Sequence, residues 1–253
     1  MSDVISQVLA KDPLAVLSAR QAGTAAAPEL ARLVTHADAE VRTLAVDALN
    51  ELGGPVALDA FATAVADANP QVRGSALRGL ERHGRSAPAV IRTALDRARN
   101  GYARQRLLLL LAGAGGSLDE IRQRCNAEKD AVALEGCVGA RAQLGDREAQ
   151  DSFNERLKQS RNEERRKLLE MAEKIGGPWL FPALLPVLDD TTPMIRIGVD
   201  ARPDLPDALR ACDLAVRLVV RFSGHRFTFA QEMPPNFSPA QLEEVRNYIR
   251  KGR

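Results

Sequence analysis

Aromatic residues are scarce in this sequence, and their scarcity indicates how the core is built. Only 4% of the 253 residues are aromatic and there is a single Trp, whereas Ala and Leu are abundant. Such side chains suit closely packed helices. Segments of alternating Val-rich sequence are also few, so we predict an almost entirely helical chain with hardly any sheet.

Cysteine and histidine are rare as well. The three cysteines, Cys125, Cys137 and Cys212, form no Cys-x-x-Cys pair, and we expect each to be a small buried hydrophobic residue of a cytoplasmic protein. The histidines are not spaced as metal ligands, and we expect each of them in a loop or at a helix end. They are His36, His83 and His225.

Long hydrophobic runs and catalytic motifs are missing. No apolar stretch approaches the ~18 residues of a membrane-spanning helix, and the first residues do not resemble a secretory signal. The chain has no G-x-S-x-G, no G-x-x-x-x-G-K phosphate loop and no His-Glu pair. We therefore predict a cytoplasmic protein without membrane contact. We also expect no catalytic residues, no cofactor and no metal site, so the protein should not be an enzyme.

What the sequence does contain is a repeated segment. DAEVRTLAVDALNELG at residues 38–53 returns as NPQVRGSALRGLERHG at 69–84 and as NGYARQRLLLLLAGAG at 100–115. A period of about 31 residues is typical of solenoids built from stacked repeats.

Each copy carries the signals of one helix with a start and a stop. Asp38, Asn69 and Asn100 have short acceptor side chains that can cap the free amides of a first turn. Apolar residues follow at helical spacing, and Leu80 lies on the face that must be buried against neighbouring helices. A glycine then ends each helix, where a left-handed conformation is expected. These glycines are Gly23, Gly53, Gly84, Gly115, Gly145, Gly176 and Gly224.

The pattern predicts an all-α fold, an α-solenoid of stacked antiparallel helix pairs. Residues 1–23 would form an N-terminal capping helix pair, 24–200 the repeats and 201–253 an irregular helical cap. An inner helix is expected to begin at Thr192-Pro193, with Arg196 in register with Arg165, and 225–229 could be extended. The predicted outer helices are 28–34, 55–66, 88–97, 118–126, 146–157 and 178–188.

A capped turn followed by V-R-x-x-A-x-x-x-L and a terminal glycine resembles the HEAT repeat, above all the short bacterial kind found in phycobilisome lyases. The resemblance covers most of residues 24–200. It implies an armadillo-like α-solenoid whose inner helices line a concave side and hold other macromolecules. It also implies that the repeated arginines join neighbouring turns in a ladder, with Asp67 and Asp190 as acceptors. These arginines are Arg42, Arg73, Arg104 and Arg196.

Charge is unevenly distributed along the chain, although the net charge is only +2. Residues 1–72 carry a net charge of −5, residues 73–124 a net charge of +7 with 11 basic and 4 acidic groups, and residues 125–253 none. Such polarity can steer a partner, but solvated faces give the same pattern. Nucleic-acid binding by the basic middle segment stays an alternative, although a groove for nucleic acid would show a continuous basic stripe.

Helical geometry indicates which side chains of the inner helices point away from the core. This face is mixed in charge, and the run 107–111 is apolar all round, which favours burial between neighbouring helices. A cluster of arginines near one turn between helices would form a basic edge, made of Arg97, Arg99, Arg104 and Arg106. The candidate partner-binding residues are Asp47, Arg78, Glu81, Gln105, Leu109, Glu135, Arg166 and Glu170 on the inner helices, and Arg97 and Arg99 at the edge.

The sequence therefore predicts a non-enzymatic scaffold or adaptor that binds another protein through the concave inner-helix face and the basic edge. Besides nucleic-acid binding, the resemblance leaves a second alternative open, a lyase-like or chaperone-like accessory factor for a cofactor-bearing protein.

Overall fold

A computed structural model describes residues 2–196, 208–229 and 236–252. The chain divides into two compact units, residues 1–140 and 141–253. The predicted division at residues 23 and 200 stays a prediction, and residue 200 lies outside the described residues.

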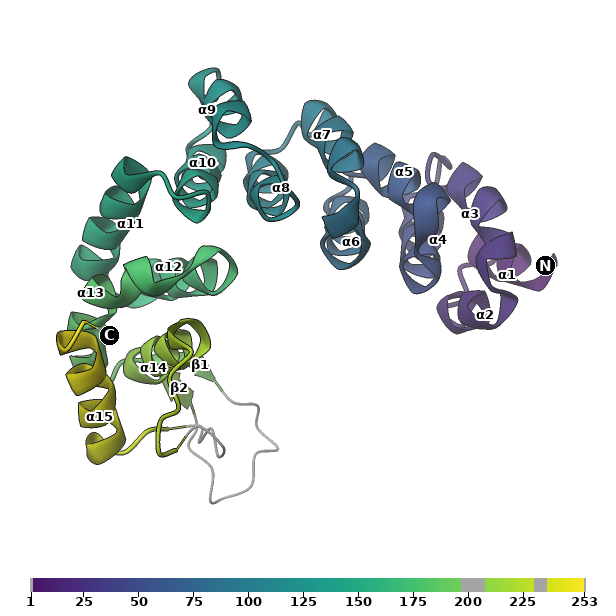
Figure 1. The fold of residues 1–253 in the computed structure, drawn as a ribbon. Helices are drawn as coiled ribbons and strands as arrows, with labels where there is room; N and C mark the ends of the chain where they lie inside the picture. The colour runs from purple at the N-terminus through teal and green to yellow at the C-terminus, as the bar shows by residue number, and fades with distance from the viewer. Residues whose placement is uncertain (1, 197–207, 230–235, 253) are drawn as a thin grey trace. The chain divides into compact units, whose positions relative to one another are not determined.

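The first unit is built from helix pairs (Figure 1). An opening pair is followed by three outer helices that alternate with inner helices, and then by α9 and α10. The elements are α1 (Ser2–Leu9), α2 (Ala15–Ala22), η1 (Thr24–Ala26), α3 (Ala27–Leu33), α4 (Ala39–Leu52), α5 (Gly54–Ala64), α6 (Pro70–His83), η2 (Gly84–Ser86), α7 (Pro88–Arg97), α8 (Gly101–Gly113), α9 (Leu118–Asn126) and α10 (Ala131–Gln143).

The helices of this unit form two layers. Helices α2, α4, α6 and α8 pack in sequence as the inner layer, and α3, α5 and α7 pack in sequence as the outer layer. Gly136 lets α10 approach α8, because a Cβ atom there would lie 2.6 Å from the Cα of Gln105. Ala45, Ala76 and Leu80 are fully buried between the layers. The predicted all-α solenoid of helix pairs is confirmed, and Leu80 lies where stacked helices meet.

The helix starts are as predicted. The side chain of Asp38 accepts a hydrogen bond from the amide of Glu40 at 2.8 Å, and Asn69 accepts one from Gln71 at 2.8 Å. Asn100 caps α8 in the same way, by accepting from the amide of Ala103 at 3.2 Å. The three turns therefore begin the inner helices alike.

The helix ends are more varied than predicted. Gly53 and Gly115 have φ of 64° and 97°, the left-handed region expected of a terminal glycine. Gly84 has φ −85° because the chain continues directly into η2, and Gly176 has φ −71° in an extended conformation. Gly176 is needed for its size instead, since a Cβ atom there would lie 2.4 Å from the carbonyl oxygen of Ala172.

The second unit begins with a helix pair and ends in a mixed region. Prolines shorten the predicted outer helix 178–188 into three short turns of helix, because each proline removes a backbone donor. The elements of the second unit are α11 (Arg147–Gln159), α12 (Asn162–Ile175), η3 (Pro178–Leu180), α13 (Phe181–Leu184), η4 (Pro186–Asp189), β1 (Pro193–Arg196), β2 (Ala208–Arg210), α14 (Ala211–Ser223) and α15 (Pro239–Arg250).

The prediction of an inner helix that starts at Thr192-Pro193 is wrong. Residues 193–196 form strand β1, which pairs antiparallel with β2, and Arg196 is exposed on it. The carbonyl groups of Asp190 and Thr192, which a helix would use, accept the amides of Cys212 and Ala211 instead. This pairing between distant segments overrides the local signal for a helix.

The last helix starts as predicted, but residues 225–229 do not have the predicted extended structure. Ser238 and Gln241 form the expected capping box of α15. Residues 225–229 form no strand and instead pack as an aromatic cluster. His225 stacks on Tyr248 with ring centroids 4.8 Å apart, and Phe227 lies 5.3 Å from Tyr248. His225 and Phe227 thus pack against α15.

The prediction for the cysteines is wrong for two of them. Cys125, near the end of α9, forms a disulfide with Cys137 in α10, their Cα atoms 5.7 Å apart. That separation is typical of disulfides. Cys212 is a free, buried thiol as predicted, and burial raises its pKa.

Candidate interaction site

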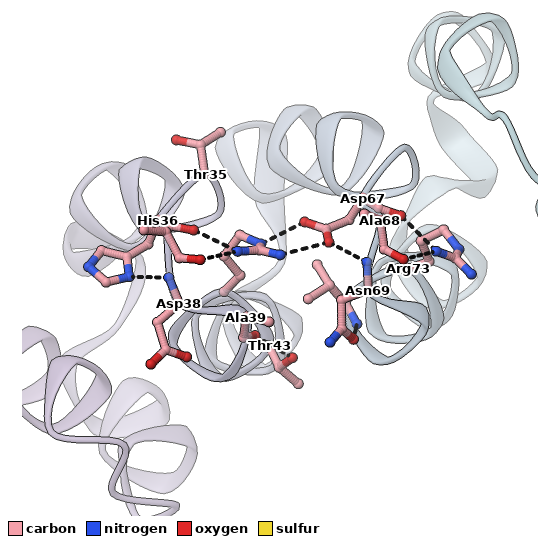
Figure 2. A network of polar contacts seen from close by, with 12 residues as sticks. Thr35, His36, Asp38, Ala39, Thr43, Asp67, Ala68, Asn69 and Arg73 are labelled. Atoms are coloured by element: carbon pink, nitrogen blue, oxygen red, sulfur yellow. Dashed lines mark hydrogen bonds and ion pairs between the residues drawn. The ribbon is translucent and has the colours of Figure 1, made fainter.

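The turn between α5 and α6 receives an arginine from the preceding repeat. Nε and Nη2 of Arg42 donate to the carboxylate of Asp67 at 2.7 and 2.9 Å, and Nη1 donates to the carbonyl oxygens of His36 and Ala37 at 2.7 and 2.9 Å (Figure 2). The two charged side chains are 15% and 11% exposed. We call such an arginine–carboxylate pair between successive turns a rung.

The rung recurs twice in the described chain. Arg104 donates to the carboxylate of Glu128 at 2.7 and 3.0 Å, and Arg165 forms an ion pair with Asp190. Each acceptor follows its arginine by 24 or 25 residues. Both predicted acceptors therefore accept an arginine, but Asp190 pairs with Arg165 and not with Arg196.

Each of the three carboxylates also binds the backbone of its own turn. Asp67 accepts the amide of Asn69 at 2.8 Å, Glu128 that of Asp130 at 2.9 Å, and Asp190 that of Thr192 at 2.9 Å. The acidic side chain thus joins the arginine of one repeat to the start of the next inner segment. His36 occupies the same place one repeat earlier, and its Nδ1 accepts the amide of Asp38 at 3.1 Å.

These contacts favour the ionised carboxylates. The hydrogen bond from Arg104 lowers the pKa of Glu128 to about 2. At Asp67, burial acts to raise the pKa, but the hydrogen bonds from Arg42 and the amide of Asn69 outweigh it and lower the pKa below its ordinary value.

Arg73, the equivalent arginine of α6, has a different environment. Its Nη1 donates to the carbonyl oxygens of Asp67 and Ala68 at 2.8 and 2.7 Å, and Figure 2 draws only these two bonds to it. Within the described chain it forms no ion pair. The residue 25 positions later is Ala98, which has no carboxylate.

The predicted residues of the inner helices are brought together largely as pairs. Arg78 of α6 is 3.6 Å from the carboxylate of Asp47 of α4, and its side chain is 63% exposed. Gln105 of α8 donates to Glu135 of α10 at 3.3 Å. The remaining predicted charges are paired too, through the ion pairs Arg106–Glu81 and Arg166–Glu170.

Two of the predicted residues are mostly buried. Gln105 and Leu109 are each 9% exposed, and the run 107–111 is buried except for a half-buried Leu110, as its composition indicated. Leu109 therefore offers a partner little surface, although its part in binding stays a prediction.

The basic middle segment is largely compensated by carboxylates. Seven of its 11 arginines form ion pairs, several of them with acidic residues of the flanking segments: these are Arg78, Arg82, Arg92, Arg104, Arg106, Arg122 and Arg124. Arg73, Arg85, Arg97 and Arg99 form none with the described residues. The predicted basic edge thus reduces to Arg97 and Arg99, which are exposed beside Ala98; Arg97 donates to the hydroxyl of Thr63 at 3.0 Å.

The sequence interpretation missed several of these partners. Glu128 was not foreseen as an acceptor, although an acidic residue 24 or 25 positions after an arginine, as for Arg42 and Arg165, is a usable signal. Arg92 and Glu120, whose carboxylate accepts two bonds at 2.8 and 2.9 Å, link the outer helices α7 and α9.

The described residues contain no group of three or more His, Cys, Asp or Glu that could hold a metal ion. In the same part of the chain, no helix is long and apolar enough to cross a membrane.

The comparisons with known proteins agree with the repeat in its first half. A solved structure of an engineered protein is similar to this chain with 14% identity and a TM-score of 0.35, covering 100% of this chain and 98% of that one. Comparison with the curated proteins gives no match. Residues 14–81, which include α2 to α5 and most of α6, match the family model of HEAT repeats, so this part of the chain is similar to HEAT repeats.

Proposed function

We propose that the chain is a scaffold that binds another protein through its inner-helix face and through the edge at the turn between α7 and α8, without catalysing a reaction. The match of residues 14–81 to HEAT repeats carries the proposal, because such repeats typically serve as scaffolds for protein interactions. The pairing of charges across successive helices supports it.

The inner-helix face suits a protein partner of mixed charge. Arg78 and Asp47 are close, yet Arg78 is 63% exposed and can bond to a further group. Complementary charges across an interface govern specificity and the rate of association more than affinity. A partner would therefore match the alternation of arginine and carboxylate along α4, α6 and α8.

The test is capture of partners from the native source, identified by mass spectrometry, with a double charge reversal. Arg78→Glu combined with Arg166→Glu should abolish the capture of proteins that bind the natural chain, while circular dichroism shows unchanged helicity. Arg85→Glu is the matched control, because Arg85 is exposed at the turn between α6 and α7 and forms no ion pair with the described residues. Equal capture by the double variant would reject the inner-helix face.

Binding of nucleic acid is the competing outcome. Only four of the 11 arginines of the middle segment lack a carboxylate partner in the described chain, so a phosphate backbone would meet mostly arginines that a carboxylate already neutralises. Filter binding over a salt series measures this directly, because each phosphate contact steepens the salt dependence. Tight, salt-sensitive binding of oligonucleotides would replace the scaffold proposal.

A cytoplasmic location belongs to the same proposal. Disulfides are rare in the reducing cytosol, so the Cys125–Cys137 bond makes it testable. Alkylation in intact cells of the source should label both thiols if the protein is cytoplasmic, whereas full protection of both would contradict that location.

A further inference from the structure

In the part of the chain that the structure describes, Arg73 is an arginine of the ladder without a carboxylate partner. We call this arginine, together with Ala98 and Asn100, the open rung. We propose that the open rung binds a carboxylate side chain from an acidic segment of a partner protein. The inference rests on the proposed function, because it names the chemistry that the basic edge recognises.

Arg73 is held in the same pose as an arginine that does bind a carboxylate. Its Nη1 donates to two successive carbonyl oxygens at 2.8 and 2.7 Å, as Nη1 of Arg42 does at 2.7 and 2.9 Å. In Arg42 this anchoring leaves Nε and Nη2 as a fork that grips Asp67. The fork of Arg73 is therefore preorganised for two parallel bonds to a carboxylate.

Ala98 occupies the place of the acceptor. It follows Arg73 by 25 residues, the interval of Arg42 to Asp67 and of Arg165 to Asp190. Its carbonyl oxygen lies 3.4 Å from Nη1 of Arg104, just as the carbonyl oxygen of Asp67 accepts Arg73. The backbone of the rung is thus present, and only the acidic side chain is missing.

A second donor belongs to the same place. At residues 36, 67, 128 and 190 the side chain accepts the amide two positions later. At Ala98 that amide belongs to Asn100, and it donates no hydrogen bond to the described residues. A carboxylate between Arg73 and Asn100 would satisfy both donors, as Asp67 does for Arg42 and Asn69.

The surroundings favour a protein carboxylate over a nucleic acid. Arg97 and Arg99 flank Ala98 and are exposed, so they add positive charge beside the open rung. The next arginine along the ladder, Arg104, is already neutralised by Glu128. A nucleic acid needs a series of positive charges at phosphate spacing, whereas this site offers one fork, one amide and two flanking arginines, which fit a short acidic segment.

NMR titration of the full chain tests the open rung. The probe is a short peptide of alternating Glu and Gly, and a peptide with Gln in place of Glu is the control. The Glu peptide should shift the Nε–H resonance of Arg73 and the amide resonance of Asn100 but leave Nε–H of Arg42 in place. The Gln peptide should shift none of the three.

Substitutions separate the open rung from general charge effects. Ala98→Asp supplies the missing carboxylate from the chain itself. It should lower the affinity for the Glu peptide about tenfold, because one charge-assisted contact is lost. Arg73→Gln should do the same. Thr93→Asp is the matched control, because it adds the same charge at an exposed position of α7 without filling the rung, and its effect should stay below about twofold.

Three outcomes would overturn the inference. The first two are that the Glu peptide leaves the resonances of Arg73 and Asn100 in the natural chain unshifted, or that it binds Ala98→Asp as tightly as the natural chain. The third outcome is that a single-stranded oligonucleotide binds more tightly than the Glu peptide and that Ala98→Asp does not weaken its binding. The proposed function is judged separately. If Arg78→Glu with Arg166→Glu abolishes partner capture while the peptide does not bind, the scaffold proposal is supported and the proposal that the open rung binds a carboxylate is rejected. If the peptide binds the open rung while the double charge reversal leaves partner capture unchanged, the inner-helix face is rejected as a binding site.

Discussion

Replacing Asp67 with alanine tests whether the ladder stabilises the stack. Asp67 accepts hydrogen bonds from Nε and Nη2 of Arg42 at 2.7 and 2.9 Å and from the amide of Asn69 at 2.8 Å. Asp67→Ala removes all three at once and leaves Arg42, which is only 15% exposed, without its carboxylate.

The magnitude follows from the burial of the pair. Exposed ion pairs contribute about 0–1 kcal/mol, whereas removing one partner of a buried pair costs about 3–5 kcal/mol. Side chains with 15% and 11% exposure lie between these limits. We therefore expect Asp67→Ala to lower the free energy of unfolding by about 2–3 kcal/mol, or the melting temperature by roughly 4–12 °C.

The effect should depend on pH in one direction. The pKa of Asp67 is lowered below its ordinary value of 3.8 in the folded chain, because the bonds from Arg42 and Asn69 outweigh the opposing effect of burial. The stabilisation is therefore complete above the pKa of the unfolded state and is lost as the pH falls through the folded pKa. The difference between Asp67→Ala and the natural chain should be constant near neutrality and shrink below about pH 4.

Urea unfolding followed by circular dichroism measures the difference. Asp59→Ala is the matched control, since Asp59 is exposed on α5, the helix before the turn that holds Asp67, and its carboxylate makes no hydrogen bond or ion pair with the described residues. The control should change stability by less than about 0.5 kcal/mol. If Asp67→Ala is as stable as Asp59→Ala at pH 7, the ladder does not hold the repeats together.

Three further changes probe other parts of the fold. Leu80→Asp, which puts a charge at a fully buried position, should cost several kcal/mol in urea unfolding; an unchanged midpoint would contradict the stacking of α6. Changing both Cys125 and Cys137 to serine should cost about 2–3 kcal/mol relative to the oxidised natural chain, because the bond closes a loop across 12 positions. Thiol titration of the oxidised natural chain after unfolding should find one reactive thiol, not three. Asp213→Ala should cost about 3–5 kcal/mol, because this fully buried carboxylate accepts hydrogen bonds from Arg210 and from the amide of Phe237. The melting temperature of the variant should fall clearly, and an unchanged melting temperature would show that these hydrogen bonds do not stabilise the fold.

Local signals in the sequence were sufficient for most of the helices. Helices α7 (Pro88–Arg97) and α9 (Leu118–Asn126) have the bounds that the sequence predicted. Their starts are marked by Pro88 at the first helical position and by Ser117, whose side chain accepts the amide of Glu120. Such signals act within one turn of the chain, and their outcome depends little on distant segments.

Contacts between distant segments could not be predicted in the same way. Strand β1 forms because β2 pairs with it, and the disulfide forms because two antiparallel helices bring Cys125 near Cys137. The residues involved carry no local mark of these partners. The same limit applied to the candidate site, where Gln105 and Leu109 were assigned to the surface from a single helix although the neighbouring helices bury them.

The uneven charge of the sequence has a simple origin in the repeat. A side chain of one repeat pairs with a side chain of the next, so the two partners lie 24 to 31 residues apart in the sequence. A count that stops at residue 72 therefore separates Asp47 from Arg78 and Glu51 from Arg82, although each pair is in contact.

Charge in a repeat protein is thus informative only after the pairs between repeats are removed. In residues 73–124 this leaves four arginines without an ion pair in the described chain. Two of them, Arg97 and Arg99, flank Ala98, and a third, Arg73 of α6, precedes that alanine by the 25 residues that separate Arg42 from its acid. A surplus spread evenly over the helices would indicate a solvated face. Its concentration at Ala98 is the physical reason to look for an acidic partner at this turn before any other.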